Sequence, residues 1–489
     1  MKSRLIPFLT FFCLVASQAF AGDIDMAKLK AQIKAELKDE IKAEIRNEVK
    51  AELRKELEPQ VRKELAGEIK KDSKSQPTVA KTETTEKSLV WDKLKFSGQV
   101  RVRPEIRRNL SQTVPMVPGE REEDVSTLLR SRFGIRYNPE KHVSFFVQGQ
   151  DSREFGEEAS ASAAAVGDDE GVDLHQGYID FLNIDDSDVS VRLGRQELSL
   201  GDERLVGAVD WSNVGRALDG IVITLDKPGY AMNTWAFATD RTTISNSGDG
   251  QYAAGVYGTW KEFPKGVLDG YYILLQDNDG ATGVASGTGD TLSVHTIGFR
   301  AKSNFDNGID FGAESAVQLG KFGSNSILAF AGHGKAGYTF DAEVKPRVGV
   351  EYNYATGDDN TSDRYTKFNS LFATEHFKYG YMDLEGWSNM HDASLAVSAK
   401  PGKFFVEGSY HLLGVDKNHS ADTFGGFTGG PGVGKIAGHE IDLLSKWTIN
   451  DYANLLGGYS HFIPGAFFKD QGMDTSADFF YLQAMAEFK

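Results

Sequence analysis

The 489-residue chain has one cysteine, Cys13, and no later apolar run that approaches the ~20 residues of a transmembrane helix. A single cysteine excludes an internal disulfide and a thiolate metal site. The missing apolar run excludes helical membrane spans. It does not exclude membrane-spanning strands, because their alternating residues average to a low hydropathy.

The usual motifs of hydrolytic chemistry are missing as well. The chain contains neither His-Glu-x-x-His nor Gly-x-Ser-x-Gly, so we expect no enzyme and no cofactor. A net charge of −16 argues against a nucleic-acid partner. Two acidic segments, 167–173 and 357–363, carry oxygen ligands suited to Ca²⁺ but lack the spacing of a dedicated site, so solvated acidic loops are the preferred interpretation.

The N-terminal 21 residues have the pattern of a secretory signal peptide. Lys2 and Arg4 precede an apolar run over 5–16, and Ala-Phe-Ala at 19–21 offers a small-x-small cleavage site. Cys13 lies inside this segment. We therefore predict an exported protein whose mature form has no thiol.

Within the segment 22–72, residues 26–72 repeat a four-residue pattern, with an apolar residue at nearly every fourth position from Leu29 to Ile69. These residues are strong helix formers, and a period above 3.6 favours a right-handed supercoil. We predict a periplasmic coiled-coil-like helical segment, with self-association through 26–72; a single solvated helix or a disordered segment is the alternative. Residues 73–93, rich in Ser, Thr, Lys and Glu, read as a linker.

The remainder, 94–489, is rich in glycine and aromatic residues and alternates polar with apolar positions, most clearly over 96–103 and 129–137. A soluble sandwich buries the apolar face of such strands, whereas a membrane barrel turns it to lipid. Eighteen candidate strands are joined alternately by short turns and long loops, which is typical of outer-membrane barrels. We predict an all-β fold, a closed antiparallel 18-stranded transmembrane β-barrel in the outer membrane, with lipid around it.

Strand parity places a set of arginines on the inner face of this barrel. Guanidinium groups bind carboxylates through a bidentate fork and focus a positive field in a narrow pore. This predicts anion selectivity, although the same arginines could instead brace the barrel by pairing with Glu105, Asp180, Glu197 or Asp219. The inward set is Arg101, Arg103, Arg107, Arg130, Arg132, Arg136 and Arg192.

Several ordered motifs make the prediction more specific: 194–198 (Gly-Arg-Gln-Glu-Leu), 201–207 (Gly-Asp-Glu-Arg-Leu-Val-Gly) and 210–216 (Asp-Trp-Ser-Asn-Val-Gly-Arg), with further matches at 354–359, 371–376 and 458–465. The region 95–489 resembles the alginate export (AlgE-like) outer-membrane β-barrel family. The resemblance implies an 18-stranded barrel with an electropositive pore, and a family member that conducts alginate, a polyuronate.

By this resemblance, Arg195, Arg204, Asp210 and Arg216 belong to the pore or to a loop folded into it. Their alternative role is a salt-bridged plug that holds the loop in place. The helical segment and the final Lys489 depart from the family pattern. We expect a porin-like channel for anionic small molecules or polysaccharides; the alternative is a structural anchor whose coiled coil tethers or oligomerises the envelope.

Overall fold

The computed structural model describes residues 90–109, 123–155, 171–239, 250–277, 291–358, 364–418, 423–424, 427–430 and 432–489. The predicted signal peptide, the coiled-coil segment and most of the linker lie outside these ranges. The last four residues of the predicted linker, Val90–Lys93, form the short 3₁₀ helix η1. In the described ranges, no helix is long and apolar enough to cross a membrane.

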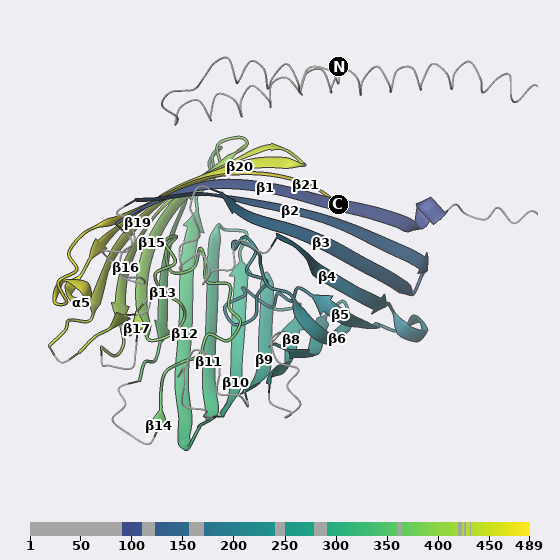
Figure 1. Ribbon diagram of the computed structural model, residues 1–489, viewed down its shortest axis with the longest axis horizontal. Coiled ribbons are helices and arrows are strands. Elements are labelled where there is room, and N and C mark those ends of the chain that lie inside the picture. The colour runs from purple at the N-terminus through teal and green to yellow at the C-terminus, as the bar shows by residue number, and fades with distance from the viewer. Residues whose placement is uncertain are drawn as a thin grey trace, which may run out of the picture. The chain divides into compact units, whose positions relative to one another are not determined.

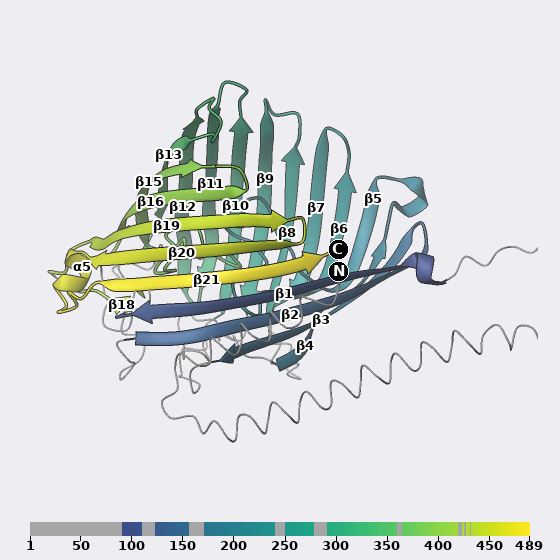
Figure 2. The same cartoon turned by 90° about the horizontal axis from the view of Figure 1, so that it is seen from above.

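Eighteen long strands of the described chain pair with their neighbours in antiparallel order and form one sheet. The sheet closes on itself, because β1 also pairs with β21 from Gly98↔Phe488 to Arg108↔Asp478. Figures 1 and 2 show these first and last strands side by side. The predicted closed 18-stranded barrel is therefore confirmed. Its strands are β1 (Leu94–Arg108), β2 (Glu123–Glu140), β3 (Val143–Phe155), β4 (Gly171–Phe181), β5 (Val189–Gln196), β6 (Leu218–Asp226), β7 (Tyr230–Ala238), β8 (Gln251–Trp260), β9 (Gly266–Asp277), β10 (Leu292–Asn304), β11 (Ile309–Phe322), β12 (Asn325–Thr339), β13 (Arg347–Ala355), β15 (Met390–Ala399), β16 (Phe404–Val415), β19 (Ile436–Asn450), β20 (Ala453–Pro464) and β21 (Ala477–Phe488).

The smaller elements lie in the connections. Of these, β14 (Arg364–Tyr365) pairs in parallel with the start of β12, whereas β17 (Thr423–Phe424) and β18 (Phe427–Thr428) pair with each other. A 3₁₀ helix, η2 (Ile184–Asp186), lies between β4 and β5, and a short helix, α5 (Ala466–Lys469), lies between β20 and β21.

The strands separate their side chains by face. On β1, Val100 and Val102 are 48% and 37% exposed, whereas Arg101 and Arg103 between and beside them are only 2% exposed. Outward positions on other strands, such as Phe133, carry exposed hydrophobic side chains in the same way. A soluble protein buries its apolar side chains, whereas here they face outward. A bilayer requires this arrangement, because lipid solvates the apolar face.

The connections differ at the two ends of the barrel. One end has short turns, for example 227–229 between β6 and β7 and 451–452 between β19 and β20. The other end has long loops, except for the two-residue link at 323–324. Both ends of the barrel chain lie on the short-turn side because the strand count is even.

Two of the long connections fold into the barrel. We call residues 197–217 the first inner loop and residues 364–389 the second inner loop. Leu205 and Val206 from the first, and Phe368 and Trp387 from the second, are buried in one cluster with inward residues of the wall such as Trp235. The two inner loops therefore occupy part of the barrel interior and pack against its wall.

Among the described residues, no group of three or more His, Cys, Asp or Glu side chains is placed to hold a metal ion. Most of the two acidic segments considered for Ca²⁺ lies outside the described ranges. Of their described residues, Gly171 to Asp173 belong to β4, and Asp358 accepts hydrogen bonds from the backbone and side chain of Thr366.

Candidate functional site

The interior face of β1 and β2 is built around four arginines. Arg101 lies directly opposite Arg130 in the strand register, and Arg132 lies opposite Gln99. With Arg103, all four are at most 8% exposed. A guanidinium stays charged at any ordinary pH, so its burial requires acceptors close by.

The first inner loop supplies many of these acceptors from its backbone. Arg101 donates to the carbonyl oxygen of Asp210 at 2.6 Å and to that of Ser212 at 2.8 Å. Arg103 donates to the carbonyl oxygen of Trp211 at 2.8 Å, and its guanidinium lies 3.6 Å from the centre of the Trp211 ring. The buried arginines therefore fasten residues 210–212 to the wall.

Asp210 adds a carboxylate to this contact. Its Oδ1 accepts from Arg130 at 2.7 Å and from Arg132 at 3.4 Å, while 62% of its side chain remains exposed. Burial would raise the pKa of Asp210, but Arg130, Arg132 and Arg101 together hold it below its ordinary value. The ionised group thus stands between buried guanidiniums and water.

The other predicted strand arginines lie toward the two ends of the barrel and are more exposed. Arg107 pairs with Glu105 at 3.0 Å on the long-loop side. Arg136 and Arg192, near the short turns, both pair with Asp180, at 3.0 and 2.6 Å. The side chains of these three arginines are 29–35% exposed. These three arginines therefore point inward and also form ion pairs with wall carboxylates, which is the bracing role that the sequence left open.

Arg204 in the first inner loop links three parts of the molecule. It donates to the Tyr379 hydroxyl of the second inner loop at 3.0 Å and to Glu351 of β13 at 2.8 Å, and it is 3% exposed. Burial would lower the pKa of Arg204, but Tyr379 and Glu351 raise it above its ordinary value. Arg204 therefore acts as a permanent charge that clamps both loops to the wall.

Arg216 and Arg195 occupy the region where β5 ends. Arg216 donates to the carbonyl oxygens of Gly207 and Ala373 at 3.3 and 3.2 Å, and burial lowers its pKa. Arg195 pairs with Asp219, its register partner on β6. Both arginines line a cavity of about 350 Å³.

The two inner loops hold each other directly. Gly207 donates its backbone N–H to the Phe372 carbonyl at 2.9 Å, and Phe372 donates to the Leu205 carbonyl at 2.9 Å. The rings of Trp211 and His376 stack with centroids 3.7 Å apart. The loops therefore form one plug, which the buried arginines attach to β1 and β2.

A cluster of buried acidic side chains on β15 and β19, with a histidine of β16, did not emerge from the sequence. The buried carboxylates of Asp392, Glu440 and Asp442 project inward, and the His411 ring lies between two of them, 2.9 Å from Asp392 and 3.8 Å from Asp442. Period-two parity over 437–443, the argument that located the arginines, would have found Glu440 and Asp442. The interior thus has a cationic and an acidic sector.

Comparisons with known proteins decide the family. The alginate export family model matches residues 92–482. The chain belongs to the alginate export family. No curated protein is significantly similar to it.

Solved structures show the same fold. OccK9 (OpdG) of Pseudomonas aeruginosa is 10% identical, with a TM-score of 0.55 over 82% of this chain and 100% of that one. OccAB1 of Acinetobacter baumannii is 15% identical, with a TM-score of 0.54 over 83% and 100%. OccK2 (OpdF) of P. aeruginosa, in a complex with glucuronate, is 11% identical, with a TM-score of 0.51 over 81% and 97%. Family and fold together make this member an outer-membrane channel rather than an enzyme.

Proposed function

We propose that the barrel is a passive channel that prefers anionic solutes, and that carboxylated sugars, from uronates to polyuronates, are its substrate class. The observation that carries the proposal is the Asp210 carboxylate, which is exposed to water yet held by Arg130 and Arg132. A solute carboxylate that takes its place meets the same guanidinium donors of Arg130 and Arg132, and hydrogen bonds between charged groups of this kind are stronger than neutral ones.

The distribution of arginines along the barrel supports this proposal. Arg107 lies toward the long loops, the buried group around Arg130 lies in the middle, and Arg136 and Arg192 lie toward the short turns. The partly exposed members keep guanidinium surface accessible, and several charges within a Debye length of ~8 Å add their fields. An anion that enters at either end therefore meets positive charge along its route.

The choice of uronates has two sources of support. The chain belongs to a family named for alginate export, and alginate is a polyuronate. OccK2, which shares the fold, has been crystallised with glucuronate. The carboxylate of a uronate is also the group that the Asp210 contact mimics.

Reversal potentials in planar bilayers under a KCl gradient test the proposal. We expect the sign of an anion-preferring pore, and glucuronate or oligouronates should reduce the single-channel current at concentrations where glucose does not. The double variant Arg136→Gln/Arg192→Gln should weaken both effects. Lys141→Gln, an exposed cation in the β2–β3 turn, is the matched control and should change neither. Preference for cations in the unaltered protein would contradict the proposal.

A further inference from the structure

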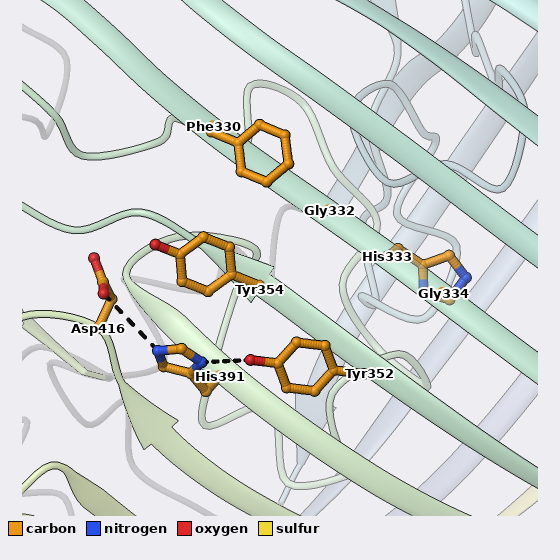
Figure 3. A pocket seen from close by; sticks show the side chains of 8 residues that line it. All are labelled: Phe330, Gly332, His333, Gly334, Tyr352, Tyr354, His391 and Asp416. Atoms are coloured by element: carbon orange, nitrogen blue, oxygen red, sulfur yellow. Dashed lines mark hydrogen bonds and ion pairs between the residues drawn. The ribbon is translucent and has the colours of Figure 1, made fainter.

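The outer wall between β12 and β15 carries a groove. Gly332 and Gly334 occupy successive outward positions on β12, and a Cβ added at Gly334 would meet nothing within 4 Å. Phe330 on β12 and Tyr352 and Tyr354 on β13 border this gap, and the cavity they help to form has a volume of about 520 Å³. Figure 3 shows these residues along two adjacent strands.

One end of the groove is polar. His391 of β15 lies between two partners, with its Nδ1 2.7 Å from the Tyr352 hydroxyl and its Nε2 3.8 Å from Asp416 (Figure 3). The ring of Tyr354 lies 4.9 Å from that of His391. Asp416 is held in place because it accepts the backbone N–H of Gly357 at 2.9 Å. This end lies toward the long loops, since β13 ends and β15 begins there.

The pairing of a tyrosine with a histidine recurs around the outer wall at the same end of the strands. In each pair the tyrosine hydroxyl lies 2.7 Å from the histidine Nδ1. On β20 and β21 the pattern varies, because a tyrosine and a histidine both contact one aspartate. Amphipathic rings of this kind collect where lipid head groups meet hydrocarbon. The members are Tyr272–His295, Tyr352–His391, Tyr410–His439, and Tyr459 and His461 with Asp478.

The distance along β19 between the two ends of the apolar band is consistent with this belt lying at the level of the lipid head groups. Trp447, near the short turns, lies eight residues from His439. Eight residues at ~3.3 Å each cover ~26 Å of strand, and a tilt of ~40° reduces this to ~20 Å across the membrane. The apolar band of an outer-membrane barrel is ~25 Å tall. Gly334 lies opposite Tyr352 in the strand register, two residues farther from the long loops than the level of Tyr354 and His391, and therefore faces the part of the acyl chains next to the head groups.

We propose that this groove binds an acylated sugar of the outer leaflet. One acyl chain lies over Gly332 and Gly334, and the sugar lies against Tyr354, His391 and Asp416. The aspartate favours a head group that presents hydroxyls, because a carboxylate accepts from hydroxyl groups and repels a bare phosphate. A mostly apolar groove with a few converging polar groups is the usual form of a specific small-molecule site.

Native mass spectrometry of the detergent-solubilised full chain, with a glucosyl diacylglycerol or phosphatidic acid added, tests this site, because the two lipids share their acyl part and differ in a sugar or a bare phosphate. We expect the unaltered protein to bind the glucosyl diacylglycerol at least ~10-fold more tightly than phosphatidic acid, and Gly334→Leu to lose at least ~10-fold of that affinity. Gly457→Leu is the matched control, because Gly457 is an outward glycine of β20 whose added Cβ would have its nearest neighbour, Leu482, at 3.7 Å. This control should bind the glucosyl diacylglycerol as the unaltered protein does.

Three results would overturn the proposal: unchanged glucosyl diacylglycerol binding by Gly334→Leu, an equal loss in Gly457→Leu, or equal binding of both lipids by the unaltered protein. Barrel folding is checked by heat-modifiable electrophoretic mobility. If Gly334→Leu does not fold, His391→Ala tests the polar end instead. We expect His391→Ala to lose the preference for the glucosyl diacylglycerol while it keeps its binding of phosphatidic acid, and an unchanged preference would equally overturn the site.

Discussion

Replacing Asp210 with asparagine isolates the electrostatic part of the proposed pore. The asparagine side-chain oxygen can still accept from Arg130, so the first inner loop keeps its attachment through the backbone carbonyls of residues 210–212. What changes is one negative charge at a position that is 62% exposed to water. Arg130 and Arg132 then act on passing solutes without a neutralising carboxylate.

The size of the effect follows from Coulomb's law. One charge acting on a solute ~8 Å away, at an effective dielectric constant of ~40, contributes ~1 kcal/mol before screening and ~0.4 kcal/mol at one Debye length. That is a ~2-fold gain in the local concentration of a monovalent anion and a ~2-fold loss for a cation. We therefore expect Asp210→Asn to raise the anion-to-cation permeability ratio by up to ~4-fold.

The assay is the reversal potential under a KCl gradient, with Asp186→Asn as the control, since Asp186 is an exposed carboxylate in the β4–β5 connection. Because the pKa of Asp210 lies below its ordinary value, the carboxylate stays ionised in mild acid, and the difference between variant and unaltered protein should persist down to pH ~4. An unchanged ratio, or one shifted toward cations, would refute the electrostatic reasoning.

Two further predictions concern the plug. Arg204→Met removes the guanidinium from Glu351, which keeps contacts with His333 and Asn353, so the loss is ~1–3 kcal/mol, and limited proteolysis should cut the inner loops faster than in Arg153→Met, whose ion pair is exposed. Burial, with Asp392 and Glu440 nearby, raises the pKa of Glu385 well above its ordinary value, so this group stabilises the docked second inner loop at low pH and loses that effect as pH rises. The hydrogen-exchange protection factors of residues 381–389, taken relative to the intrinsic base-catalysed rate at each pH, should therefore fall from pH 4.5 to 8 in the unaltered protein and much less in Glu385→Gln; an equal fall in both would count against this account.

Period-two alternation was sufficient to predict the barrel and its inward arginines. Over 96–103 and 129–137 the arginines fall on one face and the apolar residues on the other, so the face of Arg101 and Arg130 follows from strand geometry alone. Strand number and the two classes of connection followed from the same pattern. These properties are local, because each strand must expose one face to lipid whatever its neighbours do.

The plug could not be predicted in the same way. Arg204 reaches Tyr379, 175 residues away, and Glu351, 147 residues away, and no local pattern specifies such contacts. Family resemblance assigns Asp210 and Arg216 to a pore or an inner loop but specifies no partners for them. Sequence parity also left open whether the arginines attract solutes or brace the barrel, because that choice depends on which acceptors a distant loop brings to them.

The structure divides these two roles among the arginines by exposure. Arg101 and Arg103 are 2% exposed and donate hydrogen bonds to backbone carbonyls of the first inner loop. They therefore hold the plug and act on a solute only through their electrostatic field. Arg136 and Arg192 are about one-third exposed and can contact a solute directly, although both share Asp180. Asp210 joins the two groups, because its carboxylate is fastened by buried guanidiniums and is itself exposed to water. A passing carboxylate therefore competes with one side chain rather than with the whole attachment of the loop, and the loop can remain docked while the charge at its surface is exchanged.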